Sequence, residues 1–374
     1  MAKLGEVCLL KAGKFVSAND ISPEYNKGLY PCFGGNGIRG YVADYTHDGE
    51  FPLIGRQGAL CGNVNLASGK FHATEHAVVV QPKIEMNVQW LYYALNAMNL
   101  GQYATGAAQP GLAVSKLETL SIEIPNISEQ NKIAQNLYKV EQLVSVRKQQ
   151  LAKLDELVKA RFVEMFGEPI GNPMGWPVNH LVEISQLITN GNTPKGGSEN
   201  YVETGIAFLR SQNVWRNRID LSDVVYIDED THRAMKKSSV CHNDILITKT
   251  GRINTENSSL GRAALFQGKD NSANINGHVY LVRLKEGVNP RFVVTILTGE
   301  AYRKYIRKVC VGGIDKRQIN LEQVEEFPII KPPLLMQNDF ATFAERVDQQ
   351  KQTVQQSLEK LELMKKALMQ EYFG

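Results

Sequence analysis

The sequence predicts an α+β protein built by internal duplication, with two globular α/β segments and two long helices. The stretch KLDELVKARFVEMFG, residues 153–167, returns as KLELMKKALMQEYFG, residues 360–374, with seven of fifteen positions identical at an offset of 207. Upstream, the apolar run HAVVVQPKIEMNVQWL at 76–91 resembles HVYLVRLKEGVNPRFV at 278–293. Both runs are expected to form core strands followed by helices, over 87–100 and 290–309. The chain is therefore expected to have an approximate internal two-fold axis.

Each repeated stretch ends a long amphipathic pattern with apolar residues at alternating spacings of three and four, which predicts paired coiled-coil helices. The first helix is expected from about 128 to 166, with Ser128 as its N-cap. Its seam consists of Ile133, Leu137, Val140, Val144, Leu151, Leu154, Val158 and Met165, interrupted at Arg147 and Arg161. The second seam consists of Phe340, Ala344, Val347, Val354, Leu358, Leu361, Leu368 and Tyr372, interrupted at Lys351 and Lys365. The seams differ, so the helices are expected to pair antiparallel with each other, with the globular segments at opposite ends.

These features divide the chain into five segments. They are a globular domain over 1–126, a spacer helix over 127–167, a Gly- and Pro-rich linker over 168–180, a second globular domain over 181–333 and a C-terminal spacer helix over 334–374. No window of eighteen apolar residues and no signal peptide is apparent, so no membrane partner and a cytoplasmic location are expected. The five cysteines form no C-x-x-C pair, which argues against a zinc site or a disulfide framework.

Residue types suited to reading DNA bases gather in the predicted loops of both globular segments. Residues 168–320 contain 20 Lys and Arg against 15 Asp and Glu, a charge of +5 that suits a polyanion but is also common in enzymes. The candidate DNA contacts are Asn36, Arg39, Arg56, Gln57, Asn63, Asn192, Lys195, Arg210, Gln212, Asn213, Arg216, Lys249, Arg252 and Asn254. Tyr41, Asn190, Thr193 and Arg218 lie in the same segments. The alternative interpretation is that these are ordinary surface loops.

No catalytic motif accompanies these loops. The chain lacks G-x-x-x-x-G-K-[ST], H-E-x-x-H and G-x-S-x-G, and KPPL at 331–334 lacks the Asn and the aromatic residue of the adenine-methyltransferase signature. A non-catalytic binding protein is therefore favoured. Two alternatives stay open: a structural coiled-coil protein without a DNA partner, and part of a standalone methyltransferase.

The chain resembles the specificity (S) subunits of type I restriction–modification systems. The resemblance is carried by ISEQNKIAQNL and VRKQQLAKLDELVKARFVEMFG within 127–167 and their echo at 335–374, by YPCFGGNGIRGYV and LIGRQGALCGNV within 30–64, by GWPVNHLVEI at 175–184 and by DILITKTGRIN at 244–254.

The resemblance implies that each globular segment is a target-recognition domain reading one half of a bipartite, asymmetric site in double-stranded DNA. The helices would set the spacing between the halves and dock two methyltransferase (M) subunits, joined by restriction (R) subunits. The chain itself would have no catalytic residues, metal or cofactor. S-adenosylmethionine, ATP and Mg²⁺ are expected in the partner subunits.

Overall fold

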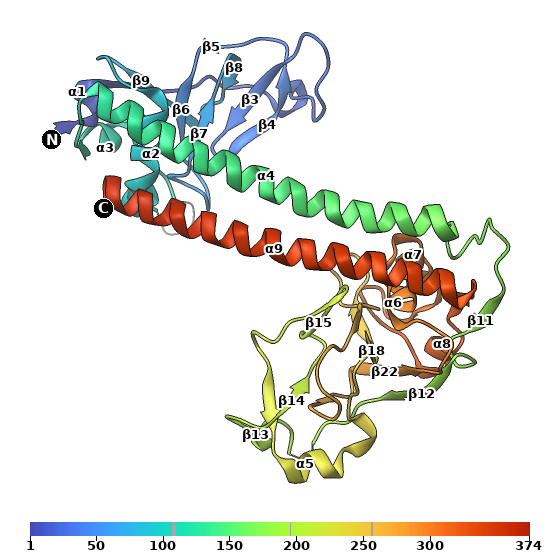
Figure 1. The fold of residues 1–374 in the computed structure, drawn as a ribbon. Coiled ribbons are helices and arrows are strands. Elements are labelled where there is room, and N and C mark those ends of the chain that lie inside the picture. The colour runs from blue at the N-terminus through green and yellow to red at the C-terminus, as the bar shows by residue number, and fades with distance from the viewer. Residues whose placement is uncertain (107–109, 195, 256) are drawn as a thin grey trace. The chain divides into compact units, whose positions relative to one another are not determined.

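The computed structural model describes residues 1–106, 110–194, 196–255 and 257–374, and Figure 1 shows their helices and strands. The chain divides into two compact units, here called unit 1 (residues 1–150 and 354–374) and unit 2 (residues 151–353). Each unit contains a globular part and segments of two long helices, α4 (Ile127–Phe166) and α9 (Leu334–Phe373). The predicted duplication of an α+β unit with two long helices is confirmed.

Unit 1 is built on two four-stranded sheets. The first is antiparallel, in the order β2 (Cys8–Ala12), β9 (Ala77–Pro82), β6 (Phe51–Gly55), β7 (Val64–Ala67). The second has the order β4 (Gly37–Val42), β3 (Tyr30–Gly34), β8 (Lys70–Ala73), β5 (His47–Asp48), with β3 and β8 parallel. A short pair joins β1 (Ala2–Lys3) to β10 (Ser121–Ile122). The short helices are α1 (Leu4–Val7), α2 (Val88–Ala97) and α3 (Val114–Glu118).

Unit 2 repeats this plan. Its first sheet is antiparallel, in the order β12 (Ser185–Asn190), β22 (Val279–Leu284), β18 (Ile245–Thr248), β20 (Ala263–Leu265). The second has the order β13 (Tyr201–Val202), β17 (Val225–Ile227), β14 (Ile206–Leu209), β21 (Ala273–Ile275), with β14 and β21 parallel. The smaller strands are β15 (Val214–Trp215), β16 (Arg218–Ile219), β19 (Thr250–Arg252), β23 (Val311–Gly312), β24 (Lys316–Gln318), β11 (Val178–His180) and β25 (Pro328–Ile330). The helices are α5 (Glu229–Ala234), α6 (Pro290–Thr298), α7 (Glu300–Val309) and α8 (Leu321–Glu325).

The central strands β9 and β22 confirm the two predicted core strands. Their apolar side chains, such as Val78 and Val282, are completely buried. A glycine follows the neighbouring edge strand in both units, at Gly13 and Gly191, and a Cβ atom at either position would lie 2.0 Å from a backbone carbonyl oxygen. The two units therefore share a backbone position that leaves no room for a side chain and that only glycine can occupy.

The helix predicted over 290–309 is two helices. Gly299 separates α6 from α7, with ψ of 153°, outside the helical range. Glycine is a poor helix former, and Asn289 caps the first of the two helices by accepting hydrogen bonds from the N–H groups of Arg291 and Phe292.

In unit 1, the first part of α4 and the last part of α9 run antiparallel. Glu141 pairs with Lys365 at 2.7 Å and Lys148 pairs with Glu362 at 3.0 Å. Ile133 and Leu137 are buried in the core of the globular part, against which Leu368 also packs. The basic interruption at Lys365 thus faces a carboxylate on the other helix.

In unit 2, the last part of α4 and the first part of α9 are likewise antiparallel. Phe162 and Phe166 pack on Phe340 and on Phe292 of α6, with ring centroids 4.9 to 5.8 Å apart. The interruption at Lys351 forms an ion pair with Asp155. Both phenylalanines of α4 lie outside the predicted seam, because they bury against the globular part as well as against α9.

The expected N-cap of α4 is corrected. The helix begins at Ile127, and the Asn126 side chain accepts the hydrogen bond of the Glu129 backbone N–H at 3.0 Å. Asn126 is therefore the cap and Ser128 lies within the first turn.

Candidate nucleic-acid interface

Two glycine-bearing loops meet in unit 1. One joins β3 to β4 and contains Asn36; the other joins β6 to β7 and contains Asn63, whose Nδ2 donates to Asn36 Oδ1 at 2.9 Å. A Cβ atom on Gly55 would lie 2.0 Å from the carbonyl oxygen of Gly35, so the loops approach as closely as their backbones allow. The structure thus brings together two predicted residues 27 positions apart, while Arg39 is exposed on the neighbouring strand β4.

The loop after β6 carries Arg56 and Gln57. The Arg56 backbone is fixed at both ends, since its N–H donates to the His76 carbonyl at 3.0 Å and its carbonyl accepts from the Leu112 N–H at 2.9 Å. The Arg56 side chain is half-buried, and its Nε has no hydrogen-bond partner among the described residues. Gln57 is exposed. A rigid backbone that presents an arginine and an amide is suited to directional hydrogen bonding.

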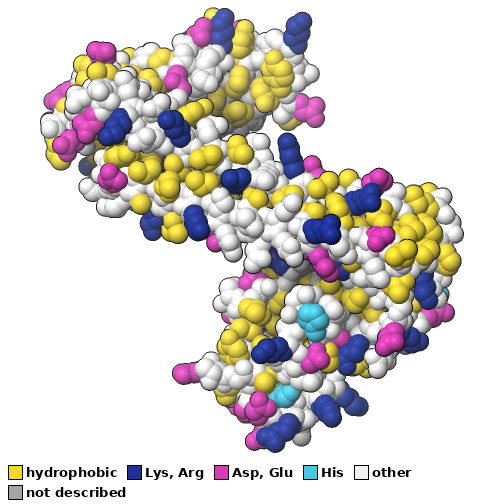
Figure 2. All heavy atoms as spheres, in the orientation of Figure 1, with side chains coloured by type: hydrophobic (Ala, Val, Ile, Leu, Met, Phe, Trp, Pro, Cys, Tyr) yellow, Lys and Arg dark blue, Asp and Glu magenta, His cyan; other side chains and the backbone are white. Residues whose placement is uncertain are grey.

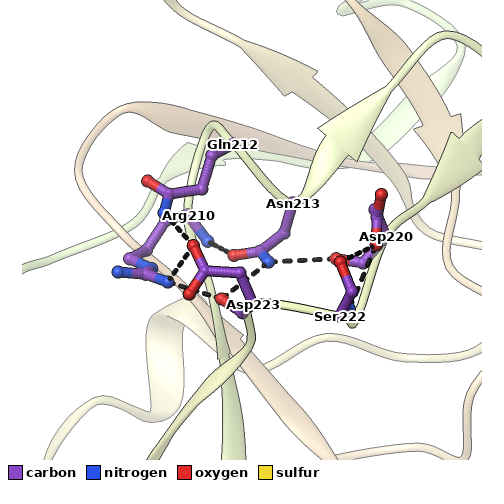
Figure 3. A network of polar contacts seen from close by, with 6 residues as sticks. All are labelled: Arg210, Gln212, Asn213, Asp220, Ser222 and Asp223. Atoms are coloured by element: carbon purple, nitrogen blue, oxygen red, sulfur yellow. Dashed lines mark hydrogen bonds and ion pairs between the residues drawn. The ribbon is translucent and has the colours of Figure 1, made fainter. Parts of the chain in front are cut away.

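In unit 2, the loop between β14 and β17 is held by the polar network shown in Figure 3. Asn213 is 1% exposed; its Oδ1 accepts from the Arg210 N–H at 2.9 Å and its Nδ2 donates to the Asp220 carbonyl at 3.0 Å. Arg210 and Gln212 both bond to Asp223. Because the Asn213 side chain is buried and both its amide oxygen and its amide nitrogen bond within the loop, Asn213 shapes the loop and leaves the set of proposed DNA contacts.

The tip of this loop is the β15–β16 hairpin, which exposes Arg216 and Arg218. Arg262, which comes from the chain just before β20, lies with its guanidinium carbon 3.9 Å from the centre of the Trp215 ring. Arg262 and Trp215 were not among the sequence candidates. They are 47 positions apart and come together because the β15–β16 hairpin lies against β20, where the Asn217 N–H donates to the Ala263 carbonyl at 2.8 Å, so no local motif marks them.

The remaining unit 2 candidates lie near β19 and the β12 end. Lys249 is half-buried with Nζ 5.8 Å from the Tyr280 ring centre, and Arg252 is exposed and pairs with Asp315 at 3.3 Å. Asn192 and Asn254 are exposed, and Lys195 lies outside the described residues. Among the described residues, no hydrogen bond or ion pair links Asn192, Lys249, Arg252 or Asn254 to the β15–β16 hairpin.

Charge alone does not outline an interface. On the face in Figure 2, Lys and Arg side chains are scattered among acidic and apolar ones. Within the described parts of the chain, no three His, Cys, Asp or Glu side chains are placed to hold a metal ion. None of the helices described has both the length and the hydropathy needed to cross a membrane.

Comparison with known proteins identifies relatives. The sequence model of the type I restriction modification DNA specificity domain matches residues 1–156 and 173–363. The EcoprrI type I specificity subunit of Escherichia coli is 52% identical over 143 residues, which are 38% of this chain and 36% of that protein. A putative type I specificity subunit of Haemophilus influenzae, S.HindORF215P, is 37% identical over 113 residues, 29% of each chain. The matched stretches thus span about a third of these curated relatives.

Comparison with solved structures finds proteins that share this fold. The crystal structure of a type I restriction–modification S subunit from M. genitalium superposes with a TM-score of 0.66 at 18% identity, covering 100% of this chain and 95% of that one. A chain solved in a study of type I complex assembly and conformational transition gives a TM-score of 0.54 at 14% identity, covering 100% and 96%. With the family model matching both halves of the duplication, the chain belongs to the family of type I restriction–modification DNA specificity domains.

Proposed function

We propose that the chain is the DNA-recognition subunit of a type I restriction–modification complex, in which each unit reads one half of a bipartite, asymmetric site. The observation that carries the proposal is the repeated sheet, β2-β9-β6-β7 in unit 1 and β12-β22-β18-β20 in unit 2, whose connecting loops differ in sequence between the two copies. A repeated scaffold with different loops suits a DNA site whose two halves differ.

The proposed contacts in unit 1 are Asn36, Arg39, Arg56, Gln57 and Asn63, which surround two loops in direct contact. In unit 2 they come from three separate stretches of the chain and are Asn192, Lys195, Arg210, Gln212, Arg216, Lys249, Arg252 and Asn254. Arg and the amide side chains can form paired hydrogen bonds with guanine and adenine, respectively, in the major groove.

The partners follow from the same proposal. The long helices would dock two methyltransferase subunits, and restriction subunits would join them. The chain would contribute no catalytic group, and S-adenosylmethionine, ATP and Mg²⁺ would bind to the partner subunits.

The test is equilibrium binding of DNA by the full chain assembled with its methyltransferase subunits, repeated between about 50 and 200 mM salt. If the complex neutralises six or more phosphates, affinity should fall by about 10³-fold or more over this range. The complex without this chain is the control. Absence of binding, or affinity independent of both salt and this chain, would remove the DNA proposal.

A further inference from the structure

Unit 2 contains a pocket of about 200 Å³ beside the β15–β16 hairpin. We call it the Trp215 pocket; the residues that line it are Trp215, Arg216, Arg218, Asn257, Ser258 and Arg262. Half of them are arginines, and among the described residues that line it there is no carboxylate. The pocket is large enough for several waters, each of which takes about 30 Å³ in the liquid.

The innermost arginine is held in place by its surroundings. Arg262 is 8% exposed, its Nε donates to the Ser258 carbonyl at 3.0 Å and its Nη2 donates to the Asn257 carbonyl. Its guanidinium carbon lies 3.9 Å from the centre of the Trp215 ring, which is a cation–π contact. A guanidinium has five N–H donors, so these two bonds leave donors that can face the pocket.

Positive charge accumulates at this place. Burial, followed by the charges of Arg216 and Arg218, lowers the pKa of Arg262. Burial, followed by the charge of Arg303 on α7, lowers the pKa of Arg216, and the carboxylate of Glu300 partly opposes this shift. The positive charge of Arg218 is partly balanced by the carboxylate of Asp220, which lies 3.7 Å from Arg218 Nη2. Mutual repulsion among guanidiniums raises the free energy of the empty pocket, and a bound anion would relieve it.

The ring of Trp215 is already covered. Arg262 lies against it, and the guanidinium carbon of Arg218 is 5.3 Å from the ring centre. The indole therefore serves to hold arginines and is poorly placed to stack on a nucleobase. Planar guanidiniums match the spacing of phosphate oxygens, which favours phosphate over a base as the ligand.

We propose that the Trp215 pocket binds one phosphodiester of the DNA backbone through Arg216, Arg218 and Arg262, an assignment that rests on the proposed DNA-recognition function. Such a contact positions the duplex on unit 2 without reading a base. Loss of this contact should weaken the binding of target and non-target DNA by the same factor.

The test measures DNA affinity against salt for the full chain assembled with its methyltransferase subunits. Each neutralised phosphate contributes about 0.9 to the slope of log affinity against log salt concentration. The double variant Arg216→Gln/Arg218→Gln should lower this slope by about 0.9, whereas Arg233→Gln should leave it unchanged. Arg233 is a matched control because it is an exposed arginine of the same unit, on α5, outside the pocket. Arg262→Lys, checked for folding by thermal unfolding, should weaken binding while keeping most of the slope.

A second measurement locates the contact. Replacing single phosphates by neutral methylphosphonates should reveal one position that weakens binding by the unsubstituted chain but not by the double variant. Equal slopes for the double variant and the unsubstituted chain, or an equal decrease in slope in Arg233→Gln, would show that the Trp215 pocket does not bind a DNA phosphate. The proposed DNA recognition would be unaffected by either result. Saturable binding of inorganic phosphate that the double variant loses, with DNA binding unchanged, would assign the pocket to a free anion instead. No salt-dependent DNA binding by the unsubstituted complex would refute the proposed function itself.

Discussion

Gln130 Oε1 accepts a hydrogen bond from the backbone N–H of Asn87 at 2.9 Å, and Gln337 repeats this contact with Asn289 at 3.0 Å. Gln130 Nε2 donates to the Pro125 carbonyl and Gln337 Nε2 to the Pro332 carbonyl, each at 2.8 Å. Both glutamines are at most 2% exposed. In each unit, one buried amide on a long helix thus ties the helix to the start of the helix that covers the sheet.

Replacing either glutamine should destabilise its own unit. Gln130→Ala leaves the Asn87 N–H and the Pro125 carbonyl without these bonds, and each buried unpaired group costs about 1–3 kcal/mol. Gln337→Ala should do the same in unit 2. Urea unfolding measures the effect, with exposed Gln135→Ala and Gln352→Ala as controls on the same helices. Equal stability of Gln130→Ala and Gln135→Ala would show that the hydrogen bonds of the Gln130 amide do not stabilise unit 1.

A buried ion pair supports the unit 2 sheet. Arg283 donates from Nε and Nη2 to Asp244 at 2.9 and 2.7 Å, and Asp244 is 1% exposed. Breaking a buried ion pair costs about 3–5 kcal/mol of stability. Because Arg283 is partly solvated, Asp244→Asn should lower the free energy of unfolding by about 3 kcal/mol, the low end of this range. Asp230→Asn, at an exposed carboxylate that also pairs with an arginine, should change the free energy of unfolding by less than about 0.5 kcal/mol. Similar losses in the two variants would contradict this role of Asp244.

The sequence predicted the scaffold better than the site. The 3.5-residue repeat places α4 within one residue of its observed start and at its observed end, because a long amphipathic pattern leaves few alternatives. The pattern predicted Ser128 as the N-cap, whereas Asn126 is the cap, because both residue types cap helices and the two positions are only two residues apart. In the same way, the 290–309 pattern is helical on both sides of Gly299, and only the backbone shows the break.

Site residues are harder to predict because their environment is built from distant strands. Asn213 is of a residue type that reads DNA bases, yet its side-chain amide forms hydrogen bonds with the backbone of its own loop. Conversely, Arg262 follows an unremarkable SSLG stretch and meets Trp215 only because the β15–β16 hairpin lies against β20. His76 and His278 occupy equivalent places in the two units, in the turns before β9 and β22.

Single arginines should affect single half-sites. Arg56→Ala in unit 1 and Arg252→Ala in unit 2 should each cost about 1–3 kcal/mol of binding and relax specificity at positions of one half-site only, if each contacts a base. Affinities for DNA substituted in one half or the other measure this, with Arg233→Ala as the control. Equal losses at both half-sites for either variant would contradict independent reading.

Shortening both helices should change the spacing read. Removing residues 148–154 and 355–361, equivalent positions at the offset of 207, deletes one heptad from each helix while keeping the seams in phase. Seven residues of helix span about 10 Å, roughly three base pairs at 3.4 Å each. DNA selection with random spacer lengths should show a shorter preferred spacer or no assembly. An unchanged spacer in an assembled complex would show that the helices do not set it.

Genome-wide mapping of N6-methyladenine tests bipartite recognition most directly. The chain and its methyltransferase subunits would be expressed in cells otherwise free of this methylation, and cells with the methyltransferase alone would serve as the reference. Methylated adenines should occur in two short, different segments separated by a constant number of unread bases, and should disappear without the chain. One uninterrupted motif, or a methylation pattern that does not depend on the chain, would contradict the account.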